Sequence, residues 1–322
     1  MGRRDGTWPP APEPLPGPVV DNHTHLDAVL AETDAAGWRT AGEAAGEAAG
    51  DAPPAEPEAD AVARHLAAAA AAGVTRVVQV GCDLPSAQWT ARLVREHTAV
   101  VGAVAIHPNE AVLHAGVREV APDGLAPAPR DHHDVGLDDA IAQVAAVAAA
   151  EPRIRVIGET GLDHFRAGER GRAVQREAFR AHVALAKELD LVLQIHDRDA
   201  HEEVLEVLAA DGAPDRTVFH CYSGDAPMAR FCAAQGWYLS FAGPVTFRAN
   251  TALREALHAV PLSQVLLETD APYLTAHPLR GRPNAPAFLA LTARAVAREL
   301  GRDLAEVCAV VSSTSEELYG PW

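Results

Sequence analysis

The sequence predicts an α/β fold, a single (β/α)8 TIM barrel, from three observations. Short apolar runs alternate with helical segments along the chain, which is the rhythm of parallel strands joined by crossover helices. Several of these runs end in His, Glu or Asp, and active sites of such barrels gather at the C-terminal strand ends. The apolar runs number eight, and they lie near residues 19, 77, 103, 156, 193, 218, 239 and 267.

The chain has 322 residues, of which 48% are hydrophobic, and this suits one barrel with a sizeable core. We expect a single hydrolase domain over residues 18–320, preceded by a disordered tail at residues 1–17 that is rich in Pro and Gly. An acidic segment near residues 28–60 holds a Gly-Glu-Ala near-repeat and three prolines, so it predicts a flexible, solvated insertion in a barrel loop. The alternative for this segment is a lid over the site.

The remaining elements follow from apolar pattern and from helix stop and start residues. Gly73 ends the first long helix, and Pro85 stands in the first turn of the next one. Strands are expected near residue 19, where Val19 and Val20 lead into the first histidines, and at 74–80, 99–106, 154–159, 191–196, 217–220, 237–241 and 265–270. Helices are expected at 58–72, 85–97, 138–150, 169–189, 198–210, 225–235, 250–259, 285–300 and 304–319, with a long connection at 109–136.

The charge and the cysteine content of the chain limit which classes of function and which cell compartments we expect for this protein. There are 27 basic and 44 acidic residues, a net charge of −17, which argues against a protein that coats duplex DNA non-specifically. Phosphate esters stay possible as substrates if metal ions supply local positive charge. The four cysteines form no C-x-x-C pair, and no secretory signal or membrane-spanning stretch is evident, so we expect a cytoplasmic protein.

The strongest local signal is His23-Thr24-His25 directly after an apolar run. Residues two apart on a strand face the same way, so both imidazoles can bind one divalent ion. Two surface histidines would give the same pattern by chance. The rest of the chain decides between these readings, because His107, Glu159, His196, His220 and Asp270 also stand at the ends of apolar runs.

Each of these residues has an ordinary alternative role, such as a helix cap, a core histidine or a turn. Their convergence at one barrel mouth instead indicates a metal site. Four histidines and two carboxylates exceed the needs of one tetrahedral ion, so we expect two divalent ions. The adjacent pair His132-His133 in the long connection is interpreted as solvated, because no partner for it is evident in the sequence.

Six motifs in chain order resemble the TatD family of metal-dependent deoxyribonucleases, which are amidohydrolase-like barrels. They are Asp21 to Asp27, Ile106 to Pro108, Ile157 to Asp163, His196 to Ala200, Phe219 to Gly224 and Leu267 to Tyr273. The resemblance implies that His23, His25 and Asp270 bind one metal and that His196 and His220 bind the second. It implies a bridging role for Glu159 and a phosphate contact for His107.

The resemblance further implies an enzyme that cleaves DNA at single-stranded or frayed ends, in an exonuclease-like manner. We expect a monomer, and ions of Mg²⁺, Mn²⁺ or Zn²⁺ suit phosphate chemistry and these ligands. Metal-bound hydroxide would attack phosphorus, with Asp270 as the proton acceptor, so Asp270, Glu159 and His107 are the expected catalytic residues. The sequence leaves two alternatives open. One is an amidohydrolase or lactonase that acts on a small carbonyl substrate, and the other is a binding protein that keeps a vestigial site.

Overall fold

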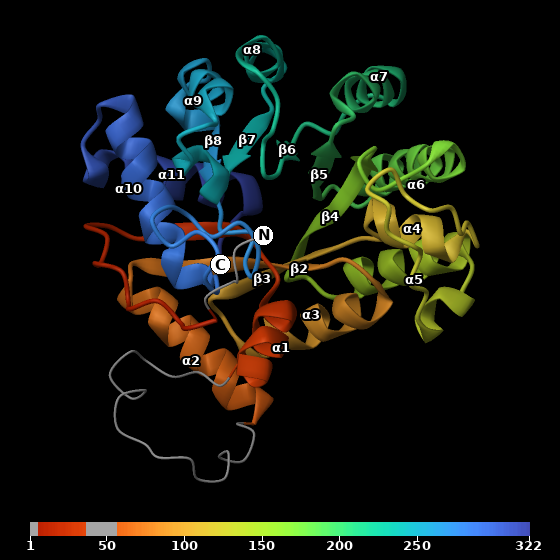
Figure 1. The fold of residues 1–322 in the computed structure, drawn as a ribbon, viewed down its shortest axis with the longest axis horizontal. Coiled ribbons are helices and arrows are strands. Elements are labelled where there is room, and N and C mark those ends of the chain that lie inside the picture. Colours follow the sequence, from red (N-terminus) through yellow and green to blue (C-terminus); the bar gives the residue numbers. More distant parts are fainter. Residues whose placement is uncertain (1–5, 37–56) are drawn as a thin grey trace.

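The computed structural model describes residues 6–36 and 57–322, and over these residues an eight-stranded parallel sheet curls into a barrel (Figure 1). The strands follow one another in chain order around the sheet, and each pairs in parallel with the next. They are β1 (Val19–Thr24), β2 (Val74–Gly81), β3 (Val100–Val104), β4 (Ile154–Asp163), β5 (Val192–Arg198), β6 (Thr217–Phe219), β7 (Tyr238–Phe241) and β8 (Val265–Leu267). The predicted fold class is confirmed.

The barrel closes where β1 meets the chain that leaves β8. The backbone N–H of Asp270 donates to the carbonyl of His23 over 3.0 Å, and the N–H of His25 donates to the carbonyl of Ala271 over 2.8 Å. The amide nitrogen of Asn22 adds a bond of 2.7 Å to the carbonyl of Leu267. Closure therefore brings the first and last candidate ligands side by side.

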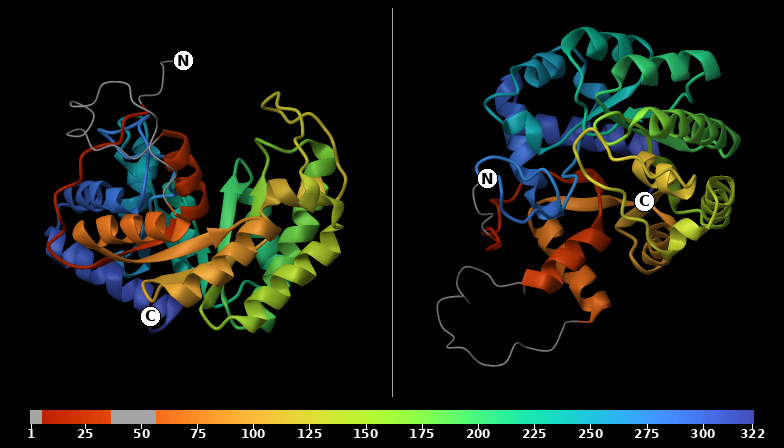
Figure 2. Two further views of the ribbon diagram at one scale, coloured as in Figure 1. Left: turned by 90° about the horizontal axis from the view of Figure 1, so that it is seen from below. Right: turned by 45° about the vertical axis from the view of Figure 1, so that its right-hand side comes forward.

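The helices lie around the outside of the strands (Figures 1 and 2). They are α1 (Leu26–Ala36), α2 (Glu58–Ala71), α3 (Leu84–Glu96), α4 (Pro108–His114), α5 (Leu137–Ala150), α6 (Glu169–Glu188), α7 (His201–Asp211), α8 (Ala226–Ala234), α9 (Thr251–His258), α10 (Leu289–Leu300) and α11 (Leu304–Tyr319). Short 3-10 segments cover Asp131–Asp134, Gly243–Thr246, Leu262–Gln264 and Pro286–Phe288.

Alternation along the strands builds two separate apolar layers. Val78 and Val80 of β2 face into the barrel with Val101 of β3, and the last residues of α11, Leu318 and Tyr319, join this inner cluster. Val77 and the other intervening residues face outward into the larger cluster between strands and helices. The barrel is thus a packed core, and polar chemistry is confined to its mouth.

Two expectations about the connections change. The region near residues 28–60 begins with α1, and the rest of the expected insertion, residues 37–56, lies outside the described residues. The 109–136 connection begins with α4, which starts at Pro108. β4 also continues to Asp163, beyond the strand end expected at Glu159, because it pairs with β5 as far as Arg198.

The expected disordered tail is wrong for residues 6–17. Trp8 is only 2% exposed, and it packs in a cluster with Val29, Ala271 and Phe288. The guanidinium of Arg282 donates to the carbonyl of Trp8 over 3.0 Å. Proline and glycine content suggested disorder, but one buried indole and backbone hydrogen bonds are enough to hold an extended segment on the barrel.

No helix within residues 6–36 and 57–322 has both the length and the apolar composition needed to cross a bilayer.

Candidate metal centre

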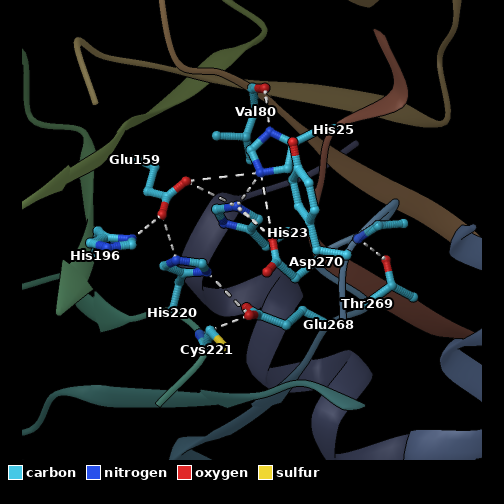
Figure 3. A network of polar contacts seen from close by, with 12 residues as sticks. His23, His25, Val80, Glu159, His196, His220, Cys221, Glu268, Thr269 and Asp270 are labelled. Carbon is cyan, nitrogen blue, oxygen red and sulfur yellow. Dashed lines mark hydrogen bonds and ion pairs between the residues drawn. The ribbon is translucent and has the colours of Figure 1, made fainter. Parts of the chain in front are cut away.

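The structure brings all seven predicted site residues to one end of the barrel, where the strands finish. Figure 3 shows all of them except His107. His23 ends up inside β1, and His25 follows that strand directly. Glu159 and His196 belong to β4 and β5. The other three residues, His107, His220 and Asp270, lie in the loops that leave β3, β6 and β8.

Close approach of β4 and β5 places Glu159 beside His196. A Cβ atom at Gly158 would lie 2.7 Å from the Cβ of Gln194 and 2.8 Å from its carbonyl oxygen. Only glycine therefore permits this spacing without a backbone shift. The Glu159 carboxylate then contacts the Nδ1 atom of His196 directly.

Glu159 stands between two groups of imidazoles (Figure 3). Its Oε2 atom lies 3.6 Å from Nε2 of His23 and 3.9 Å from Nε2 of His25. Its Oε1 atom contacts His196 and lies 2.7 Å from Nε2 of His220. One carboxylate thus presents one oxygen to each group.

Hydrogen bonds set the tautomers of His23 and His25. Nδ1 of His23 donates to the side-chain oxygen of Gln194 over 2.8 Å, and the amide nitrogen of that glutamine donates to the carbonyl of Asn22. Nδ1 of His25 donates to the carbonyl of Val80 over 3.2 Å. In the neutral imidazoles, both Nε2 atoms are therefore bare, and they face each other at 3.1 Å. Two lone pairs at this distance repel unless a cation lies between them.

Asp270 completes the first group. Its Oδ1 atom lies 3.4 Å from Nε2 of His25 and 3.7 Å from Nε2 of His23. Ligands about 2.0–2.2 Å from a tetrahedral ion are roughly 3.3 Å apart. The spacing of these donor atoms and of the Glu159 oxygen is therefore close to that of a divalent-metal site, and no large movement is needed to form one.

The second group consists of His196 and His220, and a hydrogen bond also sets the tautomer of His220. Its Nδ1 atom lies 3.2 Å from an oxygen of Glu268, so its Nε2 atom is the bare nitrogen that faces Glu159. His196 offers its second nitrogen, Nε2, to Oδ2 of Asp163 at 3.3 Å. Each imidazole is thus oriented by a carboxylate on one side and points at Glu159 with the other nitrogen.

His107 differs from these four histidines. Its Nδ1 atom accepts the backbone N–H of Asn109 over 3.1 Å, so its Nε2 atom carries the hydrogen. That N–H faces the Glu159 carboxylate at 3.5 Å. His107 therefore lies in the site as a hydrogen-bond donor, not as a nitrogen with a free lone pair.

Mutual electrostatics keep the acidic side chains ionised. Burial alone would raise the pKa of Glu159, but the imidazoles of His220, His107 and His196 outweigh it and hold that pKa well below its usual range. Burial likewise opposes a charge on His25, yet Asp270 and Glu159 raise its pKa to about 10. The site therefore attracts positive charge, which a divalent ion supplies as well as protons do.

A layer of polar residues beneath the ligands was missed by sequence reasoning. Asp21, Gln194 and Glu268 are almost fully buried. Each stands two positions before a predicted ligand, so strand periodicity could have placed them on the same face. Gln194 and Glu268 orient His23 and His220. Burial raises the pKa of Asp21 to about 8, despite hydrogen bonds from Thr269.

The interpretation of His132 and His133 as solvated is wrong. Their Nε2 atoms lie 3.1 and 2.7 Å from the same oxygen of Glu110, and His133 is only 6% exposed. The 3-10 turn at Asp131–Asp134 folds back onto α4, and this packing between distant segments has no signature in the sequence.

Relatives of known family share most of this chain. The family described as "TatD related DNase" matches residues 20–320. The "Uncharacterized metal-dependent hydrolase TatD" of Mycobacterium tuberculosis is 40% identical over 306 residues, which cover 94% of this chain and 98% of that protein. The "3'-5' ssDNA/RNA exonuclease TatD" of Klebsiella pneumoniae is 31% identical over 79% of this chain and 90% of that protein.

Solved structures agree on the fold. The crystal structure of YJJV, a TatD homologue from Escherichia coli, superposes with a TM-score of 0.72 at 21% identity and covers 94% of this chain and 98% of that one. A TatD family hydrolase from Entamoeba histolytica also has a TM-score of 0.72, at 15% identity and over 96% of this chain and all of that one. With its histidines and carboxylates gathered at the barrel mouth, the chain belongs to the TatD family of metal-dependent hydrolases.

Proposed function

We propose that this hydrolase is a two-metal phosphodiesterase that removes nucleotides from the 3′ end of single-stranded nucleic acid. The observation that carries the proposal is the placement of the Glu159 carboxylate, whose two oxygens face two separate groups of imidazoles. A carboxylate that offers one oxygen to each group could be shared by two divalent ions, which together would activate water and stabilise the leaving oxygen. The 3′ polarity is supported by the name of the Klebsiella pneumoniae relative.

The residues divide between the two proposed ions as follows. His23, His25 and Asp270 would hold one ion, and His196 and His220 would hold the other, with Glu159 shared. Two ions of Mg²⁺, Mn²⁺ or Zn²⁺ bound here would activate water and neutralise phosphate oxygens. Local positive charge of this kind also explains how a protein of net charge −17 can act on a polyanion.

Asp270 and His107 are the proposed proton-handling groups. Burial raises the pKa of Asp270, but the hydrogen bond from His25 and the charges of His23 and His220 outweigh it and lower that pKa overall. Asp270 is therefore an anion at neutral pH and can accept the proton of the attacking water. The Nε2–H of His107 points into the site and can donate a hydrogen bond to a phosphate oxygen.

Exposed rings beside the centre suit unpaired bases. Tyr273 is 55% exposed, and its ring centroid lies 5.9 Å from that of His25. Phe165 is 38% exposed and carries the guanidinium of Arg198 at 4.0 Å from its ring centroid. Stacking of a base on such a ring contributes about 1–3 kcal/mol, and a base is available for it only in a single strand or a frayed end.

The test is cleavage of 5′-labelled single-stranded DNA and RNA by metal-stripped protein, titrated separately with Mg²⁺, Mn²⁺ and Zn²⁺. We expect a metal-dependent ladder of products shortened from the 3′ end. The His23→Ala variant should lose the activity, and His258→Ala, which removes a surface histidine paired with Glu299, should keep it. Absence of cleavage with every metal would refute the proposal.

A panel of amides and lactones tests the alternative substrate class in parallel. Turnover of a small carbonyl substrate by the wild-type protein, together with no cleavage of either nucleic acid, would move the assignment to an amidohydrolase or lactonase. The proposal also retains a monomeric, cytoplasmic enzyme, and all four cysteines of the structure are free thiols, as a reducing compartment requires.

A further inference from the structure

A second group of metal-binding side chains lies at the barrel rim, in the loops and helices that follow β2 and β3. Asp83 caps the start of α3, and Glu110 and His114 belong to α4. His132 and His133 come from the 3-10 turn of the long connection. Donor atoms of His114, His132 and His133 lie within 4.8 Å of one another, and so do those of Asp83, Glu110 and His132.

His114, beside His132 and His133, has a bare ring nitrogen. Its Nδ1–H donates to the carbonyl of Val135 over 2.8 Å, so its Nε2 atom holds the lone pair. The side chain is 5% exposed, and within the part of the chain that the structure describes this Nε2 atom has no hydrogen-bond partner. A buried acceptor of this kind is costly unless something binds it.

His133 has the opposite tautomer and a different role. Its Nδ1 atom accepts the backbone N–H of Arg130 over 2.7 Å, so its Nε2–H donates to Glu110 over 2.7 Å. It therefore cannot be a ligand through Nε2 while neutral. It instead orients the Glu110 carboxylate, as the partners of metal ligands commonly do.

His132 links the remaining donors. Its Nε2 atom lies 3.1 Å from Oε2 of Glu110 and 3.9 Å from Oδ2 of Asp83. Oδ1 of Asp83 accepts the backbone N–H of Ser86 as a helix cap, and Oδ2 faces both His132 and the guanidinium of Arg130, which lies 3.7 Å away. Tetrahedral ligands are roughly 3.3 Å apart. The contact between His132 and Glu110 is already close to that spacing, and Asp83 would move slightly nearer to His132 to reach it.

We propose that His114, His132, Glu110 and Asp83 form an additional divalent-metal site, separate from the centre around Glu159. Two imidazole nitrogens and two carboxylate oxygens suit zinc better than magnesium or calcium, which take oxygen ligands. Four protein ligands leave no open position, so the ion is structural. It ties the turn at Asp131–Asp134 to α4 and to the start of α3, and thereby pins the long connection to the barrel rim.

The test is the zinc content of the full chain after saturation with Zn²⁺ and removal of free metal, measured by mass spectrometry of the element. The wild-type protein should hold one zinc more per chain than His132→Ala and than His114→Gln. The matched control is His258→Ala, which removes an exposed histidine and should equal the wild type. A His23→Ala variant should lose zinc only from the main centre and should still show the one-ion difference when His132→Ala is added.

Anomalous X-ray scattering from wild-type crystals, recorded at the zinc absorption edge, makes the test independent of variant folding. A peak between His114 and His132, within bonding distance of Glu110, would support the proposal. Equal zinc content in the wild type and both folded variants would overturn it, and so would an absent peak at this position in zinc-soaked crystals. Neither result depends on nuclease activity.

Discussion

Glu268 offers the sharpest test of how the metal centre is held. One carboxylate oxygen of this fully buried residue faces Nδ1 of His220 at 3.2 Å and accepts the backbone N–H of Cys221 over 2.7 Å. Glu268→Gln keeps an oxygen in the same place but removes the charge. A hydrogen bond to a charged group is worth about 1.5–3 kcal/mol and one to a neutral group about 0.5–1.5 kcal/mol.

The difference of about 1–1.5 kcal/mol corresponds to a roughly tenfold smaller equilibrium constant for keeping His220 in its hydrogen-bonded orientation. Groups that orient metal ligands typically change metal affinity or activity by about 10–100-fold when mutated. We therefore expect Glu268→Gln to weaken binding of the metal at His196 and His220 by about tenfold. Glu268→Ala also leaves two buried N–H groups unpaired, at about 1–3 kcal/mol each, so it should lower the free energy of unfolding as well.

The assay is a metal titration of stripped protein, read by isothermal calorimetry and by the rate of single-strand cleavage at each metal concentration. Glu299→Gln is the matched control, because Glu299 pairs with Arg254 and His258 on the surface. Higher metal should restore much of the activity of Glu268→Gln. Wild-type metal affinity and activity in this variant, at every metal concentration, would refute the positioning role.

Three further predictions concern the centre, the core and the tail. Glu159→Gln should lower activity by more than about 100-fold and reduce bound metal, because the amide keeps one oxygen and its nitrogen cannot bind the second of the two proposed ions. Glu177→Gln on the exposed face of α6 is the control, and an active Glu159→Gln would exclude a bridging role. Burial lowers the pKa of His182 to about 4. Between pH 6.5 and 4, His182 is therefore protonated in the unfolded chain but stays neutral in the folded chain. The free energy of unfolding should therefore fall as pH drops from 6.5 to 4, and His182 alone should account for about 3 kcal/mol of the loss. Urea unfolding of His182→Gln should show a correspondingly weaker pH dependence. The same pH dependence in the variant and the wild type would contradict this role of His182. Trp8→Ala should lower the free energy of unfolding by about 3–5 kcal/mol, and a change below about 0.5 kcal/mol would mean that the tail contributes nothing.

The direction in which side chains of the main centre point depends on local strand geometry, and this is why the sequence was enough to predict it. His23 and His25 face one way because strand residues alternate, and every parallel strand of a closed barrel delivers its C-terminal end to the same mouth. It was therefore enough to know which ligand-type residues end apolar runs in order to predict that they meet at one site. These residues are His107, Glu159, His196, His220 and Asp270. The same periodicity would have found Gln194 and Glu268, had it been applied two residues upstream.

Non-local packing decided the rest. The sequence does not state that Trp8 is buried beside Ala271, since proline-rich composition describes the average solvation of a segment and not one indole. Nor does it state which oxygen of Glu159 faces which histidine, or that His132 meets Glu110 and Asp83. These contacts join residues that are 22 to 136 positions apart in the chain. The sequence by itself determined the barrel, the family and the candidate ligand residues. The tertiary structure decided the tautomers of those residues, the layer that orients them and the second cluster at the rim, since hydrogen-bond direction exists only between groups that folding has brought together.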